Sequence, residues 1–161
     1  MIEPWDLDLA YRLAFLFFAG PFSVMRMYYE RKSRVDNSTE NYHESAVVRL
    51  GIVVVQSAGG LGMVLWLVHP SLMQWSEIPM PEAIRWLGAA LGTIGALSTY
   101  WVHRFLGDNF SPYLHIREEH QLVTTGPYRF ARHPMYTSLY LFLFGIFLLM
   151  ANWFVFLTQA G

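Results

Sequence analysis

The residues best suited to chemistry lie between residues 126 and 136. Arg132, His133 and Pro134 directly precede an uncharged apolar run that begins at Met135. Proline is favoured in the first turn of a helix, where its missing N–H costs no hydrogen bond, so this order predicts a helix that starts beside His133. Unpaired backbone N–H groups at such a start favour an anion, and Arg132 adds a fixed positive charge. The sequence therefore predicts a site for a carboxylate.

Two tyrosines, Tyr128 and Tyr136, lie on either side of this turn. An aromatic face attracts a sulfonium or ammonium cation, so the segment suits a ligand that carries both charges. A structural interpretation competes with this one. Arg129 and Arg132 are equally typical of charges that anchor a protein at a membrane edge, and the tyrosines are typical of interfacial aromatic residues.

Several classes of site are excluded or disfavoured by the residue types. The chain has no cysteine, which excludes disulfides, thiolate nucleophiles and cysteine-ligated metals. His115 and His120 are candidate metal ligands, but the neighbouring sequence lacks the HExxH spacing, and we expect no metal site. GxGxxG and Walker motifs are also absent, which argues against a Rossmann-type cofactor site. The formal net charge is −1, so no nucleic-acid partner is expected.

The elements that must position these residues are apolar. Hydrophobic residues make up 54% of the chain and charged residues 14%, an imbalance typical of membrane proteins. A helical span needs about 20 apolar residues, and four candidates are residues 9–29, 47–68, 86–102 and 135–158. The fourth, interrupted by Asn152 and Trp153, is compatible with one long span or with a span plus the start of another. We expect an all-α, polytopic membrane protein, a single domain over residues 1–161 with a functional loop at residues 104–134.

The distribution of positive charge predicts the orientation. Nine cationic residues lie in the connections after the first and third spans or at the span ends beside them: Arg26, Arg31, Lys32, Arg34, Arg49, Arg104, Arg117, Arg129 and Arg132. Arg12 and Arg85 fall on the other side. The positive-inside rule therefore places the N terminus outside and the loop in the cytoplasm. In the third span, Gly88 and Gly92 form a small-xxx-small pair that predicts close helix packing.

The segment HQLVTTGPYRFARHPMY, His120 to Tyr136, resembles the signature of the isoprenylcysteine carboxyl methyltransferase and phospholipid methyltransferase superfamily. The segment RFLGDNFSP, Arg104 to Pro112, is also similar to these proteins, so the resemblance covers roughly a third of the chain. The superfamily consists of membrane enzymes that use S-adenosylmethionine.

The resemblance implies methyl transfer from S-adenosylmethionine to a lipophilic acceptor, such as a prenylcysteine-like carboxylate, a thiol or a lipid amine, reached from the membrane. It assigns no catalytic residue. The cofactor-binding residues that it implies are His120, Gln121, Leu122, Val123, Tyr128, Arg132, His133, Pro134, Met135 and Tyr136. The donor's carboxylate and sulfonium match the anion and cation expected from the residues alone.

Members of the superfamily continue beyond the fourth span with a return helix and a cytoplasmic segment that carries an arginine and paired glutamates. This chain ends at Gly161, so the resemblance predicts a relative that lacks its C-terminal part and turns over poorly. Two alternatives follow: a helical membrane module without turnover, and an enzyme similar to sterol reductases that uses a nicotinamide cofactor. The intact RHPMY followed by a span favours the methyl donor. The acceptor and the oligomeric state are not specified by the sequence.

Overall fold

A computed structural model describes residues 4–35, 46–106, 126–129 and 131–159. These residues form helices and one isolated β-bridge, between Glu77 and Asn152, with no strand in the described ranges. The predicted all-α class is confirmed. The elements in chain order are α1 (Pro4–Val35), α2 (Ala46–Val68), the 3-10 helix η1 (Pro70–Ser76), α3 (Glu82–Leu106), the 3-10 helix η3 (Gly126–Arg129), α4 (Pro134–Met150) and α5 (Trp153–Gln159).

Two of the helices have the length and composition of membrane spans. They are the segment Asp8–Arg31 of α1, with a mean hydropathy of 1.2, and α2, with a mean hydropathy of 1.9. Only 17% of the α2 window is buried, so most of its apolar side chains face outward, as expected for a lipid-facing helix. The helix α4 is shorter and also apolar. The helix α3 contains the third candidate span, and it continues to Leu106, past the expected start of the loop at residue 104.

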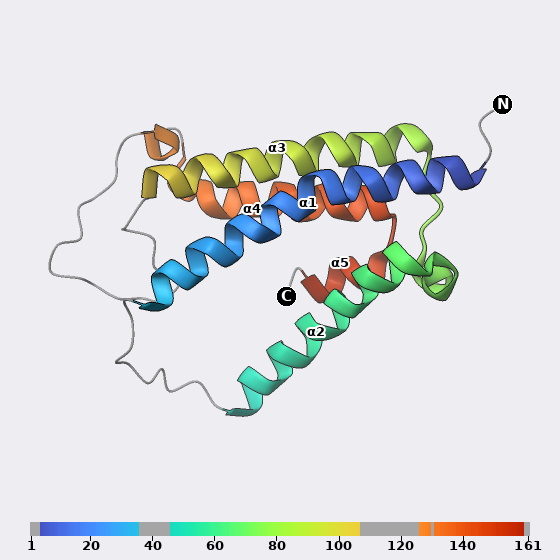
Figure 1. Ribbon diagram of the computed structural model, residues 1–161, viewed down its shortest axis with the longest axis horizontal. Coiled ribbons are helices and arrows are strands. Elements are labelled where there is room, and N and C mark those ends of the chain that lie inside the picture. The colour runs from blue at the N-terminus through green and yellow to red at the C-terminus, as the bar shows by residue number, and fades with distance from the viewer. Residues whose placement is uncertain (1–3, 36–45, 107–125, 130, 160–161) are drawn as a thin grey trace, which may run out of the picture.

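The helices α3 and α4 run antiparallel and side by side, and they form the most extensive contact of the fold (Figure 1). Glycines allow the two backbones to touch. A Cβ atom on Gly95 would lie 2.7 Å from Cα of Phe142, and one on Gly145 would lie 2.5 Å from Cα of Gly92. A Cβ on Gly88 would lie 2.5 Å from the backbone nitrogen of Leu149. The close packing predicted for Gly88 and Gly92 is therefore confirmed.

Aromatic side chains join α1 to this pair of helices and to α2. Phe142 of α4 stacks on Phe22, with 3.7 Å between ring centroids, and meets Phe18 edge to face at 5.8 Å. Phe15 contacts Trp66 of α2 at 5.9 Å. These rings belong to one buried apolar cluster, so the core lies between α1, α3 and α4 and reaches α2 through Trp66.

The stretch predicted as a fourth span, residues 135–158, divides into two helices. Ala151 follows α4 in the left-handed conformation, with φ of 51°, and ends it. The buried Asn152 then fixes the corner, because its Oδ1 accepts from the backbone N–H of Val155 at 3.0 Å and its Nδ2 donates to Ser76 Oγ at 2.7 Å. The helix α5 packs on α2, where Val155 contacts Gly62. The stretch is therefore not one continuous helix.

Candidate functional site

The start of α4 is open to a ligand. His133 occupies the N-cap position with non-helical backbone angles (φ −131°, ψ 61°), and its side chain makes no capping hydrogen bond. Pro134 follows as the first helical residue, as the sequence predicts, and the first helical bond runs from the Thr137 N–H to the His133 carbonyl at 3.2 Å. The N–H groups of Met135 and Tyr136 therefore have no acceptor within the helix.

Charged and aromatic side chains surround these N–H groups. Arg132, His133 and Tyr136 are exposed, and 62% of the Tyr136 surface is accessible. The His133 and Tyr136 rings lie 6.1 Å apart, centroid to centroid. The positive end of the helix dipole, a guanidinium and an aromatic face thus lie within one short segment, a combination that suits an anion next to a cation.

The preceding turn, η3, holds Tyr128 against the end of α3. Gly126 adopts a φ of +62°, and a Cβ atom there would lie 2.5 Å from Cδ1 of Phe105. This position therefore requires glycine both for conformation and for space. Pro127 is buried, and its carbonyl accepts from the Ala131 N–H at 3.3 Å. Burial raises the pKa of the half-buried Tyr128 phenol above the ordinary 10.0.

A buried polar cluster fixes the start of α4 onto α3. Thr99 Oγ1 donates to Ser138 Oγ at 3.1 Å, and Ser138 Oγ donates to the Met135 carbonyl at 2.9 Å. Nδ1 of His103, which is fully buried, lies 2.9 Å from the Thr99 carbonyl, and its ring lies 4.7 Å from that of Tyr29.

Sequence reasoning missed this cluster. The four-residue spacing of Thr99 and His103 was a signal that they share a helix face. Nothing in the sequence marked Ser138 and Tyr29 as their partners across the fold, because those contacts join segments far apart in the chain.

The structure gathers the predicted site residues that it describes at one end of the α3–α4 pair: Tyr128, Arg132, His133, Pro134, Met135 and Tyr136. His120, Gln121, Leu122 and Val123 lie outside the described residues and stay predictions. No group of three histidine, aspartate or glutamate side chains suited to a metal ion occurs in the described ranges.

Comparison with known families gives a match over this part of the fold. Residues 83–160, just under half of the chain, match the family model described as phospholipid methyltransferase. Over these residues the chain is similar to the phospholipid methyltransferase family. The matched residues include α3, η3, α4 and α5, and with them every described residue of the candidate site. No curated protein and no solved structure matches the chain.

The match confirms the resemblance to the superfamily that the segment from His120 to Tyr136 indicated. Together with the apolar helices, it indicates a membrane protein similar to the phospholipid methyltransferases. The family model therefore suggests methyl transfer as the broad class of activity.

Proposed function

We propose that this protein transfers a methyl group from S-adenosylmethionine to a lipophilic acceptor, such as a prenylcysteine-like carboxylate, a thiol or a lipid amine. The observation that carries the proposal is the open start of α4. There the N–H groups of Met135 and Tyr136 are unpaired within the helix and Arg132 is exposed beside them, all inside the family match.

The described residues fit the two charges of the donor. Its carboxylate is an anion and suits the N–H groups of Met135 and Tyr136 together with the guanidinium of Arg132. Its sulfonium is a cation and suits the faces of Tyr128 and Tyr136. By resemblance, His120, Gln121, Leu122 and Val123 complete this surface.

The bound donor supplies an activated methyl group: its carbon–sulfur bond breaks as the bond to the acceptor forms, the electron pair stays on sulfur, and a neutral amine or thiol acceptor also loses a proton. The protein's contribution is positioning, which supplies much of the rate when the leaving group is already activated. The Thr99–Ser138 hydrogen bond serves this role by holding the first turn of α4 against α3.

An acceptor with an apolar tail suits this location, because the site lies at one end of membrane-type helices. The tail stays among lipid chains while the reactive head reaches the start of α4. We further propose, from the distribution of cations, that this end faces the cytoplasm and that the N terminus lies outside.

Donor binding tests the proposal most directly. Arg132→Ala removes the guanidinium expected to face the carboxylate. A charge-assisted hydrogen bond is worth roughly 1.5–3 kcal/mol, so the dissociation constant for S-adenosylmethionine should rise about ten- to a hundredfold. Isothermal titration calorimetry in detergent measures it.

The matched control is Arg129→Ala, because Arg129 is also exposed but lies in η3 before the helix start. Its donor affinity should stay close to that of the wild type. Equal affinities for both variants and the wild type, with both folded, would assign these arginines to membrane anchoring. Binding of NADPH in place of the methyl donor would favour the reductase alternative.

A further inference from the structure

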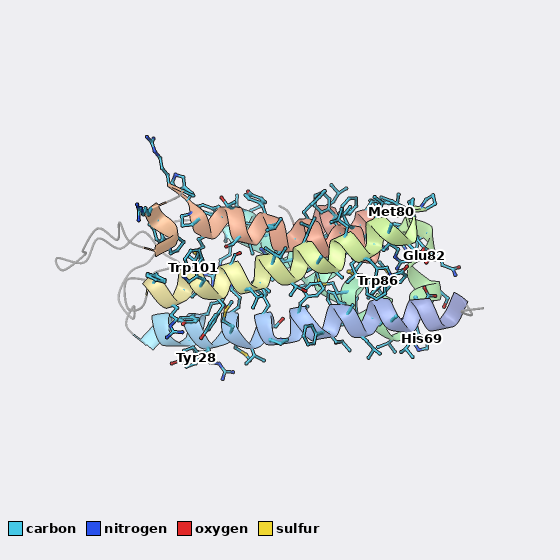
Figure 2. The ribbon with its side chains drawn as sticks, turned by 90° about the horizontal axis from the view of Figure 1, so that it is seen from above. Tyr28, His69, Met80, Glu82, Trp86 and Trp101 are labelled. Carbon is cyan, nitrogen blue, oxygen red and sulfur yellow. The ribbon has the colours of Figure 1, made fainter. Side chains whose placement is uncertain are left out.

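A polar cavity lies at the end of the molecule opposite the candidate site. Its volume is about 70 Å³, and its walls come from α1, α2, η1, α3 and the corner between α4 and α5. Figure 2 shows the two ends: His69 and Glu82 mark the end with the cavity, and Tyr28 and Trp101 mark the end where α3 meets η3. The proposed donor site uses none of the residues that line this cavity.

Both signs of charge line the cavity. Arg12 and Arg85 supply two guanidinium groups, and Asp8 and Glu77 supply two carboxylates. The formal charge of the lining is therefore zero at neutral pH. The structure shows no ion pair between these four side chains, all of which it describes. A lining of this kind matches a ligand that is itself neutral overall and carries separated positive and negative groups.

The two arginines are held in place by the ends of neighbouring helices. Nη1 of Arg12 donates to the carbonyl of Leu67 at 3.3 Å, and Nε of Arg85 donates to the carbonyl of Leu149 at 3.0 Å. The Arg85 guanidinium also lies over the Tyr11 ring, 3.9 Å from its centroid. A guanidinium has five N–H donors, so each arginine keeps donors that can bind an anion from a fixed position.

Tryptophans mark the depth of the cavity in the membrane. Three of its polar lining residues, Gln74, Arg85 and Asn152, are each followed in the chain by an exposed tryptophan: Trp75, Trp86 and Trp153. The rings of Trp75 and Trp153 lie 5.4 Å apart. Exposed tryptophans concentrate where lipid headgroups meet the hydrocarbon, so the cavity lies at headgroup level.

From these observations we propose that the cavity binds the zwitterionic headgroup of a phospholipid, with its phosphate at Arg12 and Arg85 and its ammonium at Asp8 and Glu77. The zero net charge of the lining favours a zwitterionic lipid over an anionic one. The tryptophans place the cavity at the level of lipid headgroups, which favours a lipid over a soluble ion. The proposal does not depend on methyl transfer, because this site lies at the far end of the helices from α4's start.

Lipid titration of the delipidated protein in detergent tests this site. Short-chain phosphatidylethanolamine should raise the melting temperature at about three- to fivefold lower concentration than phosphatidylglycerol, whose glycerol has no charge to offer the carboxylates. The double variant Asp8→Asn, Glu77→Gln should lose this preference. Both carboxylates are exposed, so the fold should tolerate the change.

Two control variants keep the test specific. Glu82→Gln removes an exposed carboxylate at the same end that does not line the cavity, and it should keep the preference. Arg132→Ala, at the opposite end of the helices, should also keep it. The proposal is overturned if phosphatidylglycerol is equally effective on the wild type or if the double variant keeps its preference. It is also overturned if free phosphoethanolamine binds as tightly as the lipid, because the site would then be one for a soluble zwitterion.

Discussion

The contact between α3 and α4 makes a sharp prediction about one glycine, Gly145. A Cβ atom at this position would lie 2.5 Å from Cα of Gly92 and 2.8 Å from the carbonyl oxygen of Gly88, and closer still to the backbone nitrogen of Gly92. Ordinary contacts of a Cβ atom are 3.4 Å or more. Because the obstructing atoms are backbone, no side chain can rotate away, and Gly145→Ala must push the two helices apart.

The expected cost follows from two opposing effects. Overpacking of a close-packed interior costs about 1–3 kcal/mol, and contact with backbone places this case at the upper end. Alanine is favoured over glycine within a helix by about 1 kcal/mol, which offsets part of the cost. A net destabilisation of about 2 kcal/mol corresponds to a melting temperature lower by about 4–8 °C for a chain of this size.

The assay is thermal unfolding of the purified protein in detergent, with Gly51→Ala as the control. Gly51 lies in α2, and a Cβ atom there meets nothing within 4 Å, so only the helix-propensity gain applies. The control should match or exceed the melting temperature of the wild type. If Gly145→Ala melts together with Gly51→Ala, the backbones of α3 and α4 are not in contact there and the described packing is wrong.

Three further predictions concern the site and the topology. Thr99→Val removes the hydroxyl that joins α3 to the first turn of α4 and should weaken donor binding about two- to tenfold. The control Thr93→Val loses only a hydrogen bond within α3 and should leave donor binding unchanged. Equal effects of the two variants in a binding titration would refute the positioning role. Because the chain has no cysteine, Ser71→Cys should react with an impermeant maleimide added outside the cell and Arg129→Cys only after permeabilisation, and the reverse pattern would invert the proposed orientation. Burial favours the neutral phenol of Tyr128, so this residue contributes stability below pH 10 that is lost as the pH rises from 10.0 toward the raised pKa. Tyr128→Phe should therefore reduce the fall of the melting temperature at alkaline pH. An unchanged fall would contradict the burial of the Tyr128 phenol.

The sequence alone indicated the features that depend on neighbouring residues. Long uncharged runs predicted the helices, Pro134 predicted the start of α4, and Asn152 raised the alternative of an interruption in the last apolar stretch. Each depends on local physics: transfer of apolar side chains from water, the missing N–H of proline, and the tendency of asparagine to bond with nearby backbone. The segment around Arg132 and His133 indicated the family for a similar reason, because it is continuous in sequence.

The tertiary structure alone decided what lies opposite these local elements. It paired Thr99 with Ser138 over a separation of 39 residues, joined Asn152 to Ser76, and returned α5 onto α2. It also brought Arg12 and Arg85 to the same cavity, although the sequence marked them only as the two cations outside the main group. Such pairings depend on which helix faces meet. That choice is set by the combined fit of many side chains and of glycine-lined backbones, which no single stretch of sequence contains.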